Sequence, residues 1–221
     1  MIRVLLFCLL LASTACTPAS PPLQLEQNCL AEHKTWELVN GHWLLQPKVW
    51  RIRQSALLEL GHKKIPMEGF LRLDLQQREA RLLAMNDMGV VLFDLQVSIE
   101  DEQLYRVLPQ LRQFNGLAQG VAQSLRQIFL SPFPQLDDRR EQRENSQRLW
   151  RVLPNATLGF LFDCEGDLRE TRLSDGPDDW RVVYGHYQLF GEERIPEEIV
   201  LNDYQHNVKL SLWLREVKEE R

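Results

Sequence analysis

Alternation of apolar and polar residues with a period of two is the feature of this sequence that most constrains its fold. It is clearest near the C-terminus, where Val208, Leu210, Leu212 and Leu214 alternate with Lys209, Ser211, Trp213 and Arg215. The same period recurs at residues 49–58 and 70–75, and further strand-like runs occupy residues 158–164, 168–173 and 180–190. Successive side chains of a strand point to opposite faces, so these runs predict half-buried β-strands.

Some predicted strands are apolar on both faces. Residues 81–85 and 90–97 flank Asn86-Asp87-Met88-Gly89, a sequence typical of a hairpin turn, and carry apolar residues on both sides for part of their length. Such strands are expected to be covered on both faces. Residues 59–66 predict a mostly polar turn region, and the charged and amide-rich residues 135–148 predict a solvated loop.

One helix is predicted between the two groups of strands, over residues 109–130. Its apolar residues recur at intervals of three and four: Leu111, Phe114, Leu117, Val121, Leu125 and Ile128. Ser131-Pro132 ends it, and residues 29–39 predict a shorter helix. The expected fold class is therefore mainly β (α+β), a strongly curved antiparallel sheet or unclosed β-barrel wrapped around one or two helices.

The N-terminus has the layout of a secretory signal. Arg3 precedes an apolar run at residues 4–12, which is too short to cross a membrane as a helix. Ser13-Thr14-Ala15-Cys16 resembles the bacterial lipobox, in which the cysteine is acylated, palmitate being one expected chain, and becomes the new N-terminus. An ordinary signal peptide cleaved nearby is the alternative. Thr17 is not Asp, and resemblance to the sorting rule of enteric bacteria then implies the outer membrane.

These features predict three parts in the 221-residue chain. Residues 1–15 are the signal peptide, residues 16–28 are the acylated cysteine with a proline-rich tether, and residues 29–221 are a single domain facing the periplasm. The formal net charge is −5, and loss of Arg3 with the signal makes it more negative. An acidic chain argues against nucleic acid and anionic lipid headgroups as partners.

Two cysteines remain for disulfide chemistry. Cys8 leaves with the signal and Cys16 carries lipid, so Cys29 and Cys164 are the disulfide candidates in an oxidising compartment. Two free buried thiols are the alternative.

Signatures of catalysis and metal binding are missing from the sequence. There is no Gly-x-Ser-x-Gly elbow and no Cys-x-x-Cys, and the histidines lack the spacing of a helical zinc site. We therefore expect a protein that is not an enzyme, with no catalytic residue, no metal and no cofactor. His186 is expected to be structural. A hydrolase, the alternative, predicts a serine or an acid held near His186 or His206 in a cleft.

The order of elements resembles the LolA/LolB superfamily. The residues that carry the resemblance are 69–74, 88–95, 199–203 and 208–214, and its layout spans residues 30–217. More narrowly, the chain is similar to a lipoprotein family associated with aryl polyene biosynthesis genes. Members of the superfamily are unclosed β-barrels with a helical lid over a hydrophobic cavity, and they handle lipoprotein acyl chains in the periplasm. The resemblance also implies an exposed apolar loop for membrane delivery, for which residues 85–88 are the candidate.

The resemblance and the strand pattern together imply an outer-membrane lipoprotein that binds or transfers an acyl-bearing ligand, a lipoprotein or a lipid. The residues expected to line its cavity are Leu71, Leu73, Leu75, Val91, Phe93, Leu95, Leu210 and Leu212, and the helix at 110–130 is the expected lid. A structural or assembly lipoprotein that binds an envelope protein is the alternative. It predicts a solid core and an exposed apolar patch.

Overall fold

The computed structural model describes residues 32–112 and 116–220 of the chain. In this part of the chain, twelve strands form one antiparallel sheet. The strands of the first half are β1 (Val49–Leu60), β2 (Lys63–Asp74), β3 (Glu79–Met85), β4 (Val91–Val97) and β5 (Glu102–Val107). Those of the second half are β6 (Arg139–Arg143), β7 (Ser146–Leu153), β8 (Ala156–Asp163), β9 (Leu168–Ser174), β10 (Trp180–Phe190), β11 (Glu193–Asp203) and β12 (Val208–Glu219).

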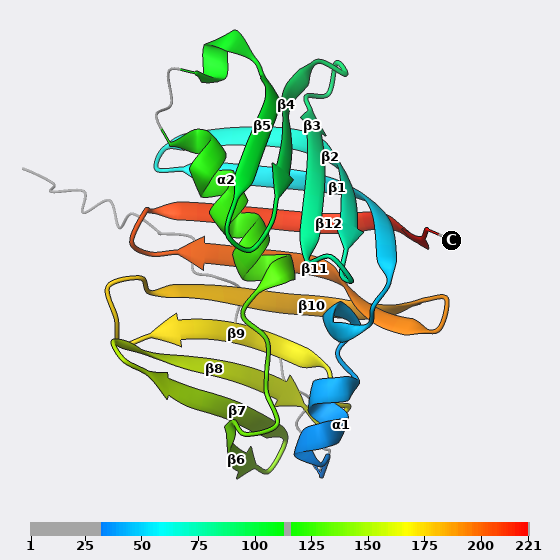
Figure 1. Ribbon diagram of the computed structural model, residues 1–221, viewed down its shortest axis with the longest axis vertical. Coiled ribbons are helices and arrows are strands. Elements are labelled where there is room, and N and C mark those ends of the chain that lie inside the picture. The colour runs from blue at the N-terminus through cyan, green and yellow to red at the C-terminus, as the bar shows by residue number, and fades with distance from the viewer. Residues whose placement is uncertain (1–31, 113–115, 221) are drawn as a thin grey trace, which may run out of the picture.

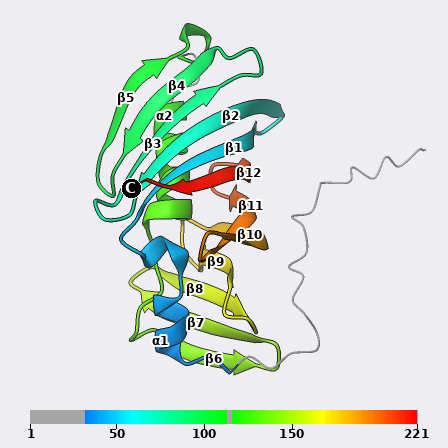
Figure 2. The same ribbon diagram turned by 90° about the vertical axis from the view of Figure 1, so that its right-hand side faces the viewer.

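The sheet consists of two meanders that meet at the pairing of β1 with β12. Its strand order is β5-β4-β3-β2-β1-β12-β11-β10-β9-β8-β7-β6, so the described strands leave β5 and β6 as separate edges. The half from β1 to β5 bends over the helix α2 (Leu117–Leu125), as the side view shows (Figure 2). The expectation of a strongly curved, unclosed antiparallel sheet around a helix is confirmed.

The predicted alternation sets the inner face of the sheet. Opposite each other on the central strands lie Leu58 and Leu210, and then Ala56 and Leu212. All four are buried in one hydrophobic cluster. The inner face of the sheet is therefore formed by the apolar residues that alternate with polar ones in the sequence.

The segment that joins β5 to β6 crosses the concave face of the sheet (Figure 1). It contains the 3₁₀ turn η2 (Pro109–Leu111), the helix α2 and the π-helical turn η3 (Arg126–Leu130). The prediction of one helix from residue 109 is wrong at its start, because Gly116 has a φ of 80° and α2 begins only after it. A residue in the left-handed region cannot continue a right-handed helix.

Between residue 32 and β1 the structure describes two short helical elements. They are α1 (Thr35–Asn40) and the 3₁₀ turn η1 (Trp43–Leu45). The predicted helix at 29–39 is thus shifted toward the C-terminus, and residues 29–31 lie outside the described part. Trp43 and Leu44 are buried, so η1 fixes the start of the sheet against the core.

Two predicted irregular regions are strands. Residues 135–148 contain β6 and the start of β7, so the prediction of a loop there is wrong. Because β6 is an edge strand whose residues are charged or amide on both faces, it has no alternating pattern to read. In the region 59–66, β1 and β2 continue up to a tight turn at Gly61, whose φ is 58°.

The outer face of the first meander is partly open. Phe70 on β2 is 45% exposed, and its cross-strand partner Leu83 on β3 is only half-buried. Val90, at the start of the run that contains β4, is 43% exposed. The prediction that residues 81–85 and 90–97 are covered on both faces is therefore wrong at Leu83 and Val90. No helix in the described residues is long and apolar enough to cross a membrane.

Candidate functional site

An open groove lies at the end of the sheet where β1 ends and β12 begins. Figure 1 shows this end of the two strands at the left. Its volume is about 830 Å³, within the usual range for small-molecule sites. Its apolar lining comes from Leu58, Leu60, Leu117, Val121 and Val208. Its other lining residues are Gly116, Gln119, Gly120, Gln123, Ser124, Arg126, Asp203 and His206. The groove thus combines an apolar floor with a polar rim.

Behind the groove, a narrow slot separates α2 from the inner face of the sheet. The slot encloses about 20 Å³, room for about one water molecule. Three residues, Leu58, Val121 and Ser124, line both the groove and the slot. The two spaces are therefore neighbours along α2, and the slot is much the smaller of them.

One wall of the slot is polar. The side chain of Gln54 on β1 lies there, only 2% exposed, and its Oε1 atom has no hydrogen-bond partner among the described residues. A Cβ added at Gly69 on β2 would lie 3.1 Å from Gln54 Cγ and Nε2, so the glycine leaves room for the amide. The β1–β12 register also shifts between Arg53 and Gln54, as at a β-bulge. The sequence did not lead us to Gln54. The feature that could have done so is a polar residue at a position where the alternation of β1 points inward.

The residues expected to line a cavity occupy two environments. Phe93, Leu210 and Leu212 line the slot. Four others, Leu71, Leu73, Leu75 and Leu95, are buried in the hydrophobic cluster, and Val91 is half-buried on β4. These four leucines belong to the same packed core as η3.

The residues expected to form a lid are distributed along the crossing segment. Leu117 and Val121 line the groove, and Val121 and Leu125 line the slot. Leu111 is half-buried in η2, Ile128 is 2% exposed in η3, and Phe114 lies outside the described residues.

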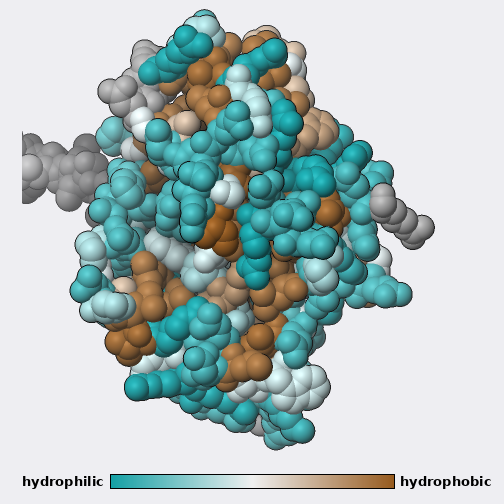
Figure 3. All heavy atoms as spheres, viewed as in Figure 1, coloured by the Kyte–Doolittle hydropathy of each residue, from teal (hydrophilic) through white to brown (hydrophobic). Residues whose placement is uncertain are grey.

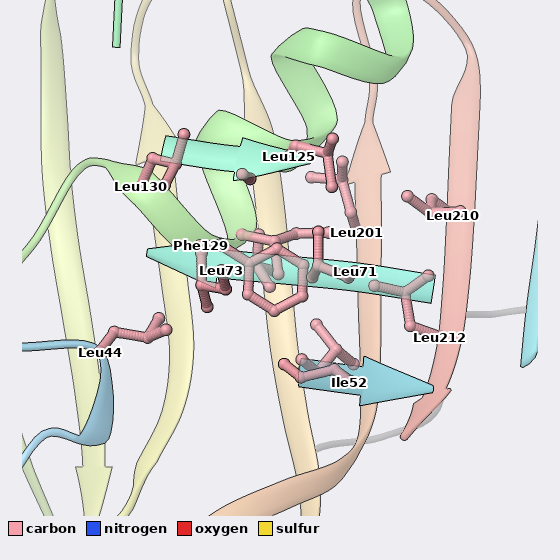
Figure 4. Packing of buried hydrophobic residues seen from close by; sticks show 14 of the residues in the cluster. Leu44, Ile52, Leu71, Leu73, Leu125, Phe129, Leu130, Leu201, Leu210 and Leu212 are labelled. Atoms are coloured by element: carbon pink, nitrogen blue, oxygen red, sulfur yellow. The ribbon is translucent and has the colours of Figure 1, made fainter. Parts of the chain in front are cut away.

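The crossing segment is anchored at its C-terminal half. Arg126 donates from Nε to the carbonyl oxygen of Ser98 at 2.8 Å and pairs with Glu102 at 2.7 Å. Phe129 of η3 is fully buried and points into the cluster that includes Leu71 and Leu73 (Figure 4). Residues 116, 119 and 120, by contrast, are exposed at the start of α2. The start of α2 beside the groove is therefore more exposed than its C-terminal end, although Val121 belongs to the core.

The polar rim contains an acid–histidine pair. His206 Nδ1 lies 2.9 Å from Asp203 Oδ2 in the turn between β11 and β12, and Asp203 Oδ1 accepts from the His206 backbone N–H at 2.9 Å. This places an acid beside a histidine in the groove, as the hydrolase alternative predicts. The nearby Ser124 hydroxyl is engaged with the carbonyl oxygen of Gly120 at 2.8 Å. The pair is explained by turn formation, and His186 is an exposed residue on β10.

The hairpin between β3 and β4 exposes a methionine. Met88 is 79% exposed, and the backbone N–H groups of Met88 and Val90 donate to Asn86 Oδ1 at 3.1 and 2.8 Å. The side chain of Asn86 therefore holds the turn that presents Met88. Seen from the side of Figure 1, hydrophobic side chains form separate patches between polar ones, one of them at this upper end of the molecule (Figure 3).

A buried histidine lies near the anchored end of the segment. His42 is 6% exposed, its Nδ1 accepts from the backbone N–H of Leu44 at 3.2 Å, and its ring meets Phe133 edge to face. Burial lowers the pKa of His42 to about 4, because the charged ring would lose its hydration. His42 is therefore neutral in the folded protein at neutral pH.

The lipidation site and one disulfide candidate lie outside the described residues. Cys16 and Cys29 belong to residues 1–31. His33, four positions after Cys29, has its Nε2 2.9 Å from the carbonyl oxygen of Cys164. Four residues of extended chain span up to about 14 Å, so the chain between Cys29 and His33 is long enough to permit a pairing with Cys164. The disulfide stays a prediction, as does lipidation of Cys16.

The described residues contain no group of three His, Cys, Asp or Glu side chains that could hold a metal ion. The groove and slot therefore offer apolar contacts, one buried amide and a polar rim as their means of recognition.

Comparison with known proteins identifies the fold. No family model and no curated protein matches the chain. A LolA superfamily protein from Nitrosomonas europaea has a similar structure, with a TM-score of 0.55 and 8% identity, over 86% of this chain and 95% of that one. A putative outer membrane lipoprotein-sorting protein domain from Vibrio parahaemolyticus matches at a TM-score of 0.49 and 9% identity, over 78% and 86%. The expected LolA/LolB-like resemblance is confirmed as a fold, and the chain has the fold of a LolA superfamily protein.

Proposed function

We propose that this chain binds an acyl-bearing ligand, a lipoprotein or a lipid, between α2 and the concave face of its sheet. The observation that carries the proposal is the shared lining of the groove and the slot by Leu58, Val121 and Ser124. An acyl chain that enters the groove first meets Leu58 and Val121, which also line the slot under α2. The similar structure in the LolA superfamily supports the same reading at the level of the fold.

Binding requires the first half of α2 to move away from the sheet, because the slot in the closed form holds only about 20 Å³. The exposed start of α2 and the anchor at Arg126 allow such a hinged movement. Each methylene buried in the slot contributes roughly 0.8 kcal/mol, so a chain of several methylenes offsets the free energy needed to lift α2 from the sheet. The ligand is thus held mainly by apolar contact, without chemical conversion.

We place the protein in the outer membrane, held by an acylated Cys16 and facing the periplasm. Two or three acyl chains on one residue give stable anchoring, whereas one chain is marginal. Labelling with radioactive palmitate that is lost in Cys16→Ser supports acylation of Cys16. Equal labelling of both forms contradicts it.

A second candidate, an assembly lipoprotein that binds an envelope protein, is favoured by two observations. The slot between α2 and the sheet has room for only about one water molecule. The free edge at β5 also carries exposed apolar side chains, Leu104 at 41% and Tyr105 at 48%, with Ile99 at 45% before it. This candidate predicts that no acyl ligand enters the slot.

Native mass spectrometry of the Cys16→Ser form, purified gently from an envelope fraction, separates the two candidates. A copurified mass of an acyl lipid or lipopeptide supports the carrier and identifies its ligand class. A clean protein mass, together with no uptake of the fluorescent fatty acid cis-parinaric acid, contradicts it and favours the assembly protein.

A further inference from the structure

The inner slot contains a polar group that an acyl chain alone leaves unsatisfied. Gln54 is 2% exposed and faces apolar neighbours such as Leu58, Leu82 and Phe93. Its Oε1 has no partner among the described residues. A buried amide without partners is costly, and such groups are rare in native structures unless they serve a purpose.

The position of this amide follows from the alternation of β1. Gln54 lies in the same inward register as Ile52 and Ala56, and the break in the β1–β12 pairing beside it falls on β12. On the neighbouring strand, Gly69 leaves room for the amide, because a Cβ there would lie 3.1 Å from the Gln54 side chain and 3.2 Å from Leu82 Cδ1 and would require them to shift. The inward register of β1 and the missing side chain at Gly69 together leave the amide facing the slot.

We infer that Gln54 recognises a hydroxyl group carried in mid-chain by the acyl ligand. This inference rests on the proposed function. A hydroxyl both donates and accepts, so it pairs with the amide in either orientation of its oxygen and nitrogen. A plain hydrocarbon leaves the amide unpaired. A carboxylate is excluded by the lining of the slot, in which the described residues contribute no cation to balance its charge.

The distance along β1 from the groove to Gln54 sets the position of the hydroxyl on the ligand. Leu58 lies where the groove meets the slot, and Gln54 is four residues deeper along β1. At about 3.3 Å per residue the amide is about 13 Å from that junction. A head group held at the rim therefore leaves the hydroxyl well down the chain.

The test compares two fatty acids that differ by one hydroxyl. Ricinoleate is oleate with a hydroxyl in mid-chain, and each displaces cis-parinaric acid from the Cys16→Ser form of the full chain. We expect ricinoleate to bind about tenfold more tightly than oleate, since it satisfies the buried amide. An α-hydroxy fatty acid, with its hydroxyl beside the head group, is expected to show no such advantage.

Gln54→Met removes the amide and preserves the length of the side chain. We expect it to bind ricinoleate and oleate equally. Gln127→Met is the matched control, because Gln127 is also buried, at 5% exposure, with an unpaired Oε1, yet does not line the slot. It should keep the preference.

Each outcome is decisive. Equal binding of both fatty acids to the unmodified site, or a preference that survives Gln54→Met, overturns the role of Gln54 while the proposed function stands. Failure of both fatty acids to displace the probe, or of the probe to bind, overturns the proposed function itself.

Discussion

Trp43 and Phe129 meet edge to face in the core, with ring centroids 6.4 Å apart and planes at 79°. Trp43 comes from the turn that precedes β1, and Phe129 comes from the π-helical end of the crossing segment. Both side chains are at most 2% exposed. The contact therefore fastens the C-terminal end of the crossing segment to the start of the sheet.

Phe129→Ala is expected to destabilise the fold strongly. Removing a fully buried ring loses its transfer free energy and leaves a cavity, which together cost about 3 to 5 kcal/mol. Urea denaturation followed by circular dichroism measures this loss. Phe70→Ala is the control, since Phe70 is 45% exposed on the outer face. Equal losses in the two variants would contradict the anchoring role of Phe129.

Stability is expected to fall as the pH drops from about 6.5 to 4. Burial lowers the pKa of His42 to about 4, so the unfolded chain binds a proton that the folded chain excludes. The stabilisation by neutral His42 is fully present above about pH 6.5. About 3 kcal/mol of the free energy of unfolding is lost as the pH falls from there to about 4. His42→Asn keeps an acceptor for the Leu44 N–H and should flatten this part of the pH profile. His62→Asn, at an exposed turn position, should leave it unchanged; an unchanged profile in His42→Asn contradicts the assignment.

Cys29 and Cys164 are expected to form a disulfide. His33 contacts the Cys164 carbonyl oxygen, and Cys29 precedes His33 by four residues. The chain between them is therefore long enough for the two cysteines to pair. The predicted result is a mass two daltons lower than the reduced form, and a loss of about 2 to 4 kcal/mol on reduction. The double variant Cys29→Ala, Cys164→Ala should not respond to reductant. Two thiols that react freely in the unreduced protein would show that the pair is open.

Met88→Ser is expected to weaken binding to vesicles of neutral phospholipid by about tenfold, because burial of a methionine side chain contributes roughly 1.5 to 3 kcal/mol. The hairpin holds Met88 79% exposed at its tip. Leu189→Ser, at a site 68% exposed near the β10–β11 turn, is the matched control. Similar effects of the two substitutions, or no effect of either, would show that the hairpin does not contact the membrane.

The sheet was readable from the sequence where one face is buried. Leu210 and Leu212 alternate with polar residues because β12 has one face in the core, and the pairing with β1 places Leu58 and Ala56 opposite them. The edge strand β6 was hidden because its residues face solvent on both sides. The late start of α2 was also hidden, since the positive φ of Gly116 is a property of the folded backbone.

The site was less readable than the fold. Leu73 and Leu95 were expected to line a cavity, but the sequence cannot tell a lining side chain from a packed one, and η3 packs against this region. Gln54 carried a readable signal, as a polar residue in the inward register of Ile52 and Ala56. Its unpaired amide depends on the neighbouring strands, which no local pattern shows.

The most direct test of an acyl site under α2 is the affinity of the Cys16→Ser protein for cis-parinaric acid, with and without Gly120→Trp. A side chain at Gly120 meets nothing within 4 Å and projects into the groove, so the fold tolerates it while the groove fills. Gly120→Ala is the control, because a methyl group strengthens the helix without filling the groove. The account predicts binding to the unblocked protein and to Gly120→Ala, and a loss of at least tenfold in Gly120→Trp. Undiminished binding in Gly120→Trp, or no binding to any form, would contradict it.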